Sequence, residues 1–341
     1  MVHREINRIL EDARAVFAPQ NVSGEISRDD DAHIRVTLAE HHGIPRAPLE
    51  PGQGALLGVN LTRDRRVSGI VAFDYLTGRD HAILATSMTA GGETPINDIL
   101  TARLLGRKLL LTIYPPEQDQ PFDEAAIHAL AIEIGRHDLP VFINFFPFSR
   151  EYNFNSYGYL NAFRTAARAF RQYAENVVIV WSVNVWDVDV SGNFFPGYEY
   201  VDWAGISINA HIQRGGRLAD FAPHLESFVL THQERVPIMI TALSISHFSS
   251  IDGTYRSYQA AEALRNFYHS LEAFWPRIKA VVYFGYNDLE RAGANRNITS
   301  IAADPAVTAA YKLAVTADHF LSELPVSESE ISVQYVSVVS K

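Results

Sequence analysis

Short apolar segments recur along this chain from Gly54 onward, and segments with helical periodicity separate them. The apolar segments are nearly uninterrupted rather than alternating, which is typical of parallel strands buried on both faces. In the segment 159–173, by contrast, apolar residues recur every three or four positions, which predicts a helix with one buried face. The eight predicted strands are 55–61, 82–86, 108–114, 141–146, 177–181, 204–209, 238–243 and 280–285.

Alternating strands and helices over roughly 270 residues predict an α/β fold, a (β/α)8 TIM barrel. Proline stands at a first helical position in Thr94-Pro95 and in Asp304-Pro305, which marks two helix starts. The alternative is a doubly wound open sheet, but no Gly-x-Gly-x-x-Gly follows the first strand, so a dinucleotide site is not indicated. The clearest predicted helices are 96–105, 123–136, 159–173, 218–233, 258–274 and 305–321.

The remaining parts of the chain lie outside the predicted barrel. We divide the sequence into an N-terminal arm or linker (1–50), a (β/α)8 barrel (51–323) and a C-terminal tail (324–341). The arm holds one short amphipathic segment, 6–17, and a proline-rich stretch, 45–51. The tail nearly alternates apolar and polar residues over 331–339, which predicts a strand without a partner in a barrel. Arm and tail could therefore join copies of the chain into a homo-oligomer.

Composition limits the partners of the protein. The 341 residues carry a formal net charge of -10, which argues against a nucleic-acid partner, since such proteins need a basic face. There is no cysteine, so a disulfide framework and a thiolate metal site are excluded. No apolar run approaches the roughly 18 residues that a membrane span needs. The first residues lack the apolar core of a signal peptide, and the residues themselves leave the localisation open.

Polar and aromatic residues follow the predicted strands, where a barrel builds its site. Aromatic faces stack on the C–H groups of sugars, and amides and carboxylates bind hydroxyls, so this mixture favours a carbohydrate ligand. A phosphate ligand would favour glycine-rich turns and cations instead. His211 and His247 are single loop histidines, so we predict no metal and no cofactor. The strand-end residues include Asn60, Thr86, Ser87, Tyr114, Arg150, Glu151, Asn153, Asn184, Trp186, Asp187, Asn209, His211, Ser244, Ser246, His247, Tyr286, Asn287 and Asp288.

Four segments resemble glycoside hydrolase family 26, the β-mannanase-like retaining glycosidases that share this barrel. Arg150-Glu-Tyr-Asn153 is similar to the family's His-Glu-Met-Asn, and 176–184 is similar to its Asn-Val-x-x-x-Trp-Ser-Pro-Asn. The segment 196–205 resembles Pro-Gly-Asp-x-Tyr-Val-Asp-Trp-x-Gly. The segment 237–243 resembles Pro-Ile-Met-Ile-Ala-Glu-Phe. The likeness extends over about 54–320, and it implies a barrel that acts on polysaccharide.

The resemblance assigns roles to particular positions, and the chain departs from two of them. It implies that Glu151 is the acid/base and that Ala242 occupies the nucleophile position, where alanine can neither attack a sugar nor move a proton. Arg150 replaces the family's histidine. An alignment through Pro147 would place Arg150 rather than Glu151 in the acid/base column. An arginine beside Glu151 is expected to lower the carboxyl pKa, which is unfavourable for a general acid.

Three functions follow from these residues. The first is a glycosidase-like barrel that has lost hydrolysis and acts as a carbohydrate-binding or structural assembly protein. The alternative is an active β-glycan endo-hydrolase of the mannanase, xylanase or glucanase type, with Glu151 as acid/base and a displaced carboxylate. The third is an enzyme of another class. The resemblance also implies an extracellular or surface location. The displaced carboxylates considered are Asp187, Asp252 and Asp288; the candidate sugar-binding residues are Arg150, Asn153, Asn184, Trp186, Asn209, His211 and Tyr286.

Overall fold

The computed structural model describes residues 46–116, 122–152, 155–287 and 297–324, together with two strands nearer the N-terminus. The chain divides into two compact units, 1–45 and 46–341. In the first unit, strands β1 (Gly24–Arg28) and β2 (Ile34–Leu38) form an antiparallel two-stranded sheet that the sequence did not predict. The predicted arm helix and the predicted tail strand lie outside the described residues, so the division at residues 50 and 323 stays a prediction.

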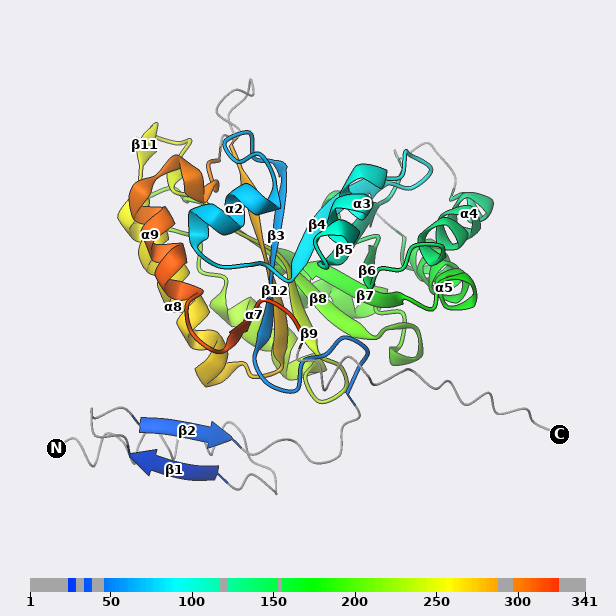
Figure 1. Ribbon diagram of the computed structural model, residues 1–341, viewed down its shortest axis with the longest axis horizontal. Coiled ribbons are helices and arrows are strands. Elements are labelled where there is room, and N and C mark those ends of the chain that lie inside the picture. Colours follow the sequence, from blue (N-terminus) through cyan, green and yellow to red (C-terminus); the bar gives the residue numbers. More distant parts are fainter. Residues whose placement is uncertain are drawn as a thin grey trace. The chain divides into compact units, whose positions relative to one another are not determined.

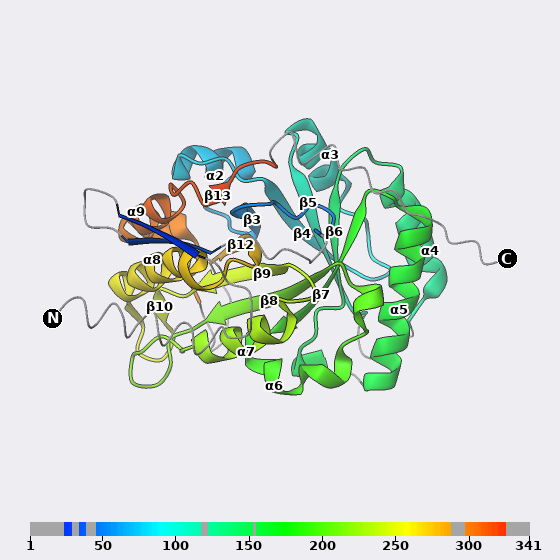
Figure 2. The ribbon, with the colours of Figure 1, turned by 90° about the horizontal axis from the view of Figure 1, so that it is seen from below.

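The second unit is a closed barrel of eight parallel strands (Figure 1). Each strand pairs in parallel with the next, and the last, β12, pairs with the first, β3, so the sheet has no open edge. Figure 2 shows the helices outside this ring of strands. The predicted TIM barrel is confirmed. The barrel strands are β3 (Ala55–Arg63), β4 (Ile83–Thr89), β5 (Lys108–Tyr114), β6 (Val141–Phe145), β7 (Val177–Asn184), β8 (Trp203–Ala210), β9 (Ile238–Ile245) and β12 (Ile278–Tyr286).

The four-residue helix α6 (Val188–Ser191) was not predicted, and the longer helices agree with the predicted segments except in two places. Helix α2 (Ile70–Thr77) was not among the predicted helices. The prediction of a last helix reaching residue 321 was wrong: α9 (Pro305–Ala314) ends early, and β13 (Phe320–Leu321) pairs with β3. The chain turns there because Phe320 is buried against the barrel. The other helices are α3 (Ile96–Leu104), α4 (Glu124–Gly135), α5 (Ser156–Tyr173), α6 (Val188–Ser191), α7 (Ala222–His232) and α8 (Ser257–Phe274).

Short elements occupy the connections after the strands. The 3-10 turns η1 (Arg150–Tyr152) and η2 (Val185–Asp187) follow β6 and β7. The hairpin strands β10 (Phe248–Ser249) and β11 (Thr254–Tyr255) follow β9. The turns η3 (Gly192–Phe194) and η4 (Tyr198–Tyr200) lie in the same connection as η2, between β7 and β8, and η5 (Ile301–Ala303) follows β12. In the part of the chain that the structure describes, no helix is both long and apolar enough to cross a membrane.

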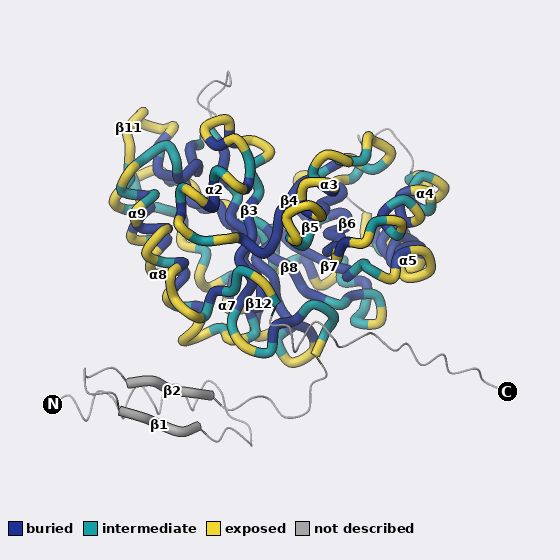
Figure 3. Tube along the Cα trace, in the orientation of Figure 1, coloured by how far each residue is buried: buried dark blue, intermediate teal, exposed yellow. Residues whose placement is uncertain are grey.

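Successive residues of each strand face opposite sides of the barrel wall. In β5, Leu109 and Leu111 belong to the apolar layer shared with the helices, and Leu110 belongs to the barrel interior. This explains why the strands read as continuous apolar runs, since both of their faces are covered. Figure 3 shows the strands as buried and the outer helix surfaces as exposed.

The barrel interior is apolar at the amino ends of the strands. Its largest side chains there are Phe142 and Trp203, whose rings make an edge contact with centroids 5.3 Å apart. Nearer the carboxyl ends the interior becomes polar. Asn144 donates to Thr112 Oγ1 at 3.3 Å and accepts from Ser182 Oγ at 2.7 Å. The interior therefore changes from a packed apolar base to a hydrogen-bonded layer along the barrel axis.

The segment preceding β3 closes the amino end of the barrel. The Trp203 indole donates to the Pro48 carbonyl at 2.9 Å. Glu50, buried, forms an ion pair with Arg277. Leu49 packs on the apolar interior. Residues 46–50, which the sequence predicted as part of a linker or arm, are thus packed on the barrel base.

Candidate functional site

The carboxyl ends of the eight strands, with the loops directly after them, form a surface that we call the barrel mouth. Inward positions at this level keep part of their side chains exposed. Tyr114 is 37% exposed and Asn209 is exposed, whereas the inward positions at the base are covered. A TIM barrel places reactive and ligand-binding groups at this end because the loops converge there.

Four of the predicted sugar-binding residues form one hydrogen-bonded chain across the barrel mouth. The Tyr286 hydroxyl donates to Asn209 Oδ1 at 3.3 Å, and Ser244 Oγ donates to the same oxygen at 3.4 Å. The Trp186 indole donates to the Asn209 carbonyl at 3.3 Å. Asn184 Oδ1 accepts from the Trp186 backbone N–H at 3.0 Å, which caps η2. The ends of β7, β8, β9 and β12 are thereby linked.

Trp186 presents a half-buried indole at the barrel mouth. His211, another predicted residue, is exposed and makes an edge contact with it, with ring centroids 6.1 Å apart. His224 of α7 makes a second edge contact at 5.6 Å. Both imidazole planes are steeply inclined to the indole plane, at 70° and 75°, the edge-to-face geometry that aromatic rings favour. Such a ring can stack on a planar or C–H-rich ligand.

Arg150 forms ion pairs with two carboxylates of the loop after β7. Its backbone N–H and its Nε reach Asp187 at 3.1 and 3.3 Å, and its terminal nitrogen reaches Asp189 at 2.5 Å. Asp187 is buried, with 8% of its surface exposed. A buried carboxylate that contacts both the backbone N–H and the guanidinium of one arginine is held in a fixed position. Asp187 is therefore a structural partner of Arg150 in this arrangement.

Glu151 follows in η1 with an exposed side chain, and its backbone N–H donates to Ser149 Oγ at 3.3 Å. The next residue, Tyr152, packs its ring 6.4 Å from that of Tyr114. Burial, with smaller contributions from Tyr114 and Glu151, raises the pKa of Tyr152 to about 12, so its hydroxyl stays protonated at neutral pH. Asn153 lies outside the described residues, so its predicted role is untested.

The backbone between β6 and η1 is strained at one residue. Phe146 has φ of 45°, a left-handed conformation that bulky residues rarely adopt. Its N–H donates to the Ile113 carbonyl at 2.8 Å, and its carbonyl accepts from Tyr159 Oη at 2.9 Å. These contacts fix the chain as it leaves β6. The sharp bend gives the segment containing Arg150 and Glu151 its position at the barrel mouth.

Ala242 stands on the inward side of β9, level with the barrel mouth. A register shift after Ile206 leaves Thr241 as an extra residue, and Ala242 then pairs with Ser207. The next inward pair is Asn209 with Ser244, whose side chains contact each other. Ala242 is half-buried. The bulge thus places a methyl group one inward step below the hydrogen-bonded chain of the site.

The other described candidate for a displaced carboxylate, Asp252, is held inside its own turn. Its Oδ1 accepts from the Thr254 hydroxyl at 2.6 Å, and Oδ2 contacts Arg256 at 2.7 Å. Hydrogen bonds from Thr254 and Ser249 lower the pKa of Asp252 to about 2. Asp288 lies outside the described residues.

Sequence reasoning missed Arg63, which belongs to the same surface. Its guanidinium carbon lies 5.0 Å from the ring centroid of Tyr286, a cation–π geometry. Burial raises the pKa of Tyr114, and the nearby Arg63 charge opposes that rise. A signal was available, because Arg63 lies only two residues beyond the first predicted strand, 55–61, and three residues after Asn60. Asn60 itself binds Thr62 of its own strand at 2.7 Å.

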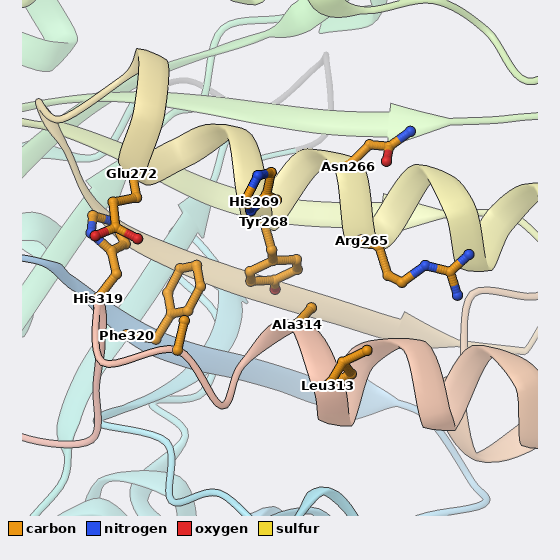
Figure 4. Close-up of a pocket in the computed structure, with 10 residues that line it drawn as sticks. Arg265, Asn266, Tyr268, His269, Glu272, Leu313, Ala314, His319 and Phe320 are labelled. Atoms are coloured by element: carbon orange, nitrogen blue, oxygen red, sulfur yellow. The ribbon is translucent and has the colours of Figure 1, made fainter. Parts of the chain in front are cut away.

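A groove also lies outside the barrel, between α8 and α9, with a volume of about 390 Å³ (Figure 4). His269 and Glu272 line it from α8, and His319 and Phe320 line it from the segment after α9. None of these residues lies at a strand carboxyl end. Among the residues that the structure describes, no three histidine or acidic side chains are grouped closely enough to hold a metal ion.

Comparison with protein-family models and with curated proteins gives no match. Solved structures do match. A modular endo-β-1,4-mannanase of glycoside hydrolase family 26 from Cellulomonas fimi is 13% identical, with 79% of this chain and 72% of that chain covered and a TM-score of 0.56. A GH26 β-mannanase from Bacteroides ovatus is 11% identical, with 79% of this chain and 90% of that chain covered and a TM-score of 0.57.

A protein named GH26C from a Muricauda species is also 11% identical, with 81% of this chain and 89% of that chain covered and a TM-score of 0.60. The structural similarity establishes a shared fold. At sequence identities this low, residue roles do not follow from it. The described barrel therefore has the fold of the family 26 glycoside hydrolases that its sequence segments resemble.

Proposed function

We propose that this protein binds a polysaccharide or oligosaccharide at the barrel mouth and does not hydrolyse it by the retaining mechanism. The observation that carries the proposal is Ala242. It occupies the inward position on β9 where the resemblance expects the nucleophile. A retaining glycosidase needs two carboxyl groups about 5 Å apart, one of which attacks the sugar. A methyl group cannot form the covalent intermediate.

The described carboxylates nearby support this reading. Asp187 is buried and paired with Arg150, and Asp252 is hydrogen-bonded within its own turn. Recruiting either as a nucleophile would require breaking these contacts first. Loss of a nucleophile typically reduces turnover by several orders of magnitude, because the remaining groups cannot stabilise the covalent transition state.

Binding does not depend on the missing nucleophile. Trp186, Asn184 and Asn209 offer an aromatic ring and two amides on one surface, and the buried Tyr286 donates its hydroxyl to Asn209. Sugars are bound through such groups, and most binding energy comes from groups that take no part in the reaction. The neighbours from Cellulomonas fimi and Bacteroides ovatus are both named as β-mannanases, which makes β-mannan the first ligand to test.

The first experiment is a turnover assay of the full chain on β-mannan, β-xylan and mixed-linkage β-glucan. We expect no release of reducing sugar above background. Glu151→Gln is the control, because it removes the acid/base candidate with little change in size. Wild-type turnover that this substitution abolishes would contradict the proposal and would favour the active endo-hydrolase with a displaced carboxylate.

The second experiment measures binding of the same glycans by affinity electrophoresis. We expect the glycan to retard migration, and we expect Trp186→Ala to weaken binding by about tenfold. Stacking of a nucleobase on an aromatic side chain contributes about 1–3 kcal/mol, and we take stacking of a sugar ring to be of similar size. Phe274→Ala is a matched control, because this exposed aromatic ends α8 outside the barrel mouth. Equal migration with and without every glycan would remove the glycan-binding function.

A further inference from the structure

The loop after β3 carries a concentration of positive charge at the barrel mouth. Arg63, Arg65 and Arg66 are all exposed. Asp64, the acid among them, is only 4% exposed, and its Oδ1 accepts from the Arg66 backbone N–H at 3.0 Å. The carboxylate is therefore buried, whereas the three arginine residues around it are exposed. The chain as a whole is acidic, with a net charge of -10, so this cationic surface is a local feature.

Packing fixes this loop next to β12. A Cβ placed on Gly285 would meet Asp64 Oδ2 at 2.9 Å, so the carboxylate occupies the space that a side chain at position 285 would fill. Gly285 directly precedes Tyr286. The inward Asp64 thus anchors the loop against the strand that carries the tyrosine of the site. Arg63 and Tyr286 are also paired in the register of β3 and β12, which places the guanidinium over the ring.

The charge of Arg63 reaches the ligand-binding residues themselves. Its guanidinium lies over the Tyr286 ring, and its charge also acts on the Tyr114 phenol across the mouth. Tyr286 in turn donates to Asn209, the residue at which the hydrogen-bonded chain converges. A ligand held by Asn209 and Trp186 therefore lies within the field of an exposed cation. A neutral glycan can accept hydrogen bonds from this guanidinium, but only an anionic glycan adds the attraction between opposite charges.

We infer that the ligand is an anionic glycan, one whose sugars carry carboxylate or sulfate groups, and that Arg63 is its specificity-determining residue. This inference rests on the proposed glycan-binding function. A guanidinium offers a planar pair of N–H donors that matches a carboxylate or sulfate in a two-point contact. The neighbouring Arg65 and Arg66 add attraction at longer range, which salt screens over about 8–10 Å.

The test is calorimetric titration of the full chain with oligosaccharides of matched length: oligomannuronate, sulfated carrageenan fragments and neutral manno-oligosaccharide. We expect at least one anionic series to bind at least tenfold more tightly than the neutral one, and its affinity to fall as salt rises. The two anionic arms decide whether carboxylate or sulfate is the recognised group.

Two substitutions separate a specific contact from general charge. Arg63→Gln should weaken anionic binding at least tenfold and neutral binding by a much smaller factor, and Arg63→Lys should restore only part of the anionic binding, because lysine keeps the charge but lacks the planar donor pair. Arg103→Gln on α3 is the matched control, since it removes the same charge from an exposed position on another surface.

The outcomes are distinguishable. Equal binding of neutral and anionic series, or anionic binding that Arg63→Gln leaves intact, overturns the inference while the glycan-binding function stands. A neutral ligand bound more tightly than both anionic series also overturns it. Absence of binding by all three series, with a folded protein confirmed by circular dichroism, overturns the glycan-binding function and the inference together.

Discussion

The two ends of the barrel interior differ in what their side chains do. At the amino ends, inward residues such as Leu56, Phe142 and Trp203 are fully buried and pack on one another. At the carboxyl ends, inward residues such as Asn209 and Tyr114 are exposed and polar or aromatic. Every strand contributes to both ends through the same alternation. The barrel thus has a packed apolar base at one end of its axis and an exposed polar mouth at the other.

The largest expected effect comes from a substitution at the packed amino end of the barrel interior. Trp203→Ala should lower the free energy of unfolding by about 3–5 kcal/mol, because it leaves a cavity under Phe142 and removes the indole that binds the Pro48 carbonyl. Urea unfolding followed by circular dichroism measures this. Trp186→Ala at the mouth is the comparison and should cost less than about 1 kcal/mol, since the half-buried ring can be replaced by water. Equal losses would show that the mouth is part of the packed core.

The next effect concerns two buried histidines, His232 in α7 and His247 after β9. Burial lowers the pKa of each to about 4, from the ordinary value of 6.5. Each is neutral in the folded protein and gains a proton more readily when unfolded. Below pH 6.5 the unfolded chain binds protons at these histidines and the folded chain does not, which favours unfolding. The free energy of unfolding is therefore unaffected above pH 6.5 and decreases as the pH falls from 6.5 towards 4. At pH 5 each should cost roughly 2 kcal/mol relative to pH 7.

His247 differs from His232 in having charged neighbours. Asp304 raises the pKa of His247 and Arg66 lowers it, and both effects are smaller than that of burial. Unfolding in urea at pH 7 and pH 5 should show that His247→Gln and His232→Gln each reduce the pH-dependent loss by roughly 2 kcal/mol. A smaller contribution from His247 alone would mean that its loop opens and lets the imidazole protonate without global unfolding. Wild-type stability independent of pH over this range would contradict both assignments.

The smallest expected effect compares two tyrosines of β12. Tyr283→Phe leaves the buried Thr299 carbonyl without the hydroxyl that binds it at 2.6 Å, and should cost about 1–3 kcal/mol. Tyr286→Phe removes a bond to the exposed Asn209, which water can replace, and should cost less than about 1 kcal/mol. Thermal and urea unfolding of both variants measure the difference. A larger loss for Tyr286→Phe would place the mouth tyrosine in the stabilising core.

Several site residues were accessible from the sequence for a simple reason. Asn184, Trp186, Asn209 and Tyr286 each follow or end an apolar run, and in a closed parallel barrel all strand ends meet on one side. Position in the pattern was therefore enough to group them. It was not enough to place Arg150, whose partners Asp187 and Asp189 come from a different loop. Pattern alone also did not indicate that Arg63 lies over Tyr286.

By itself, the sequence determined the barrel, the order of its strands and the alanine at position 242, because strand periodicity and residue identity are local properties. Only the tertiary structure decided which charges meet. The inward turn of Asp64 against Gly285, and the bulge that pairs Ala242 with Ser207, depend on register between strands distant in the chain. Side-chain contacts across strands are set by closure of the whole sheet, and no segment read alone contains that information.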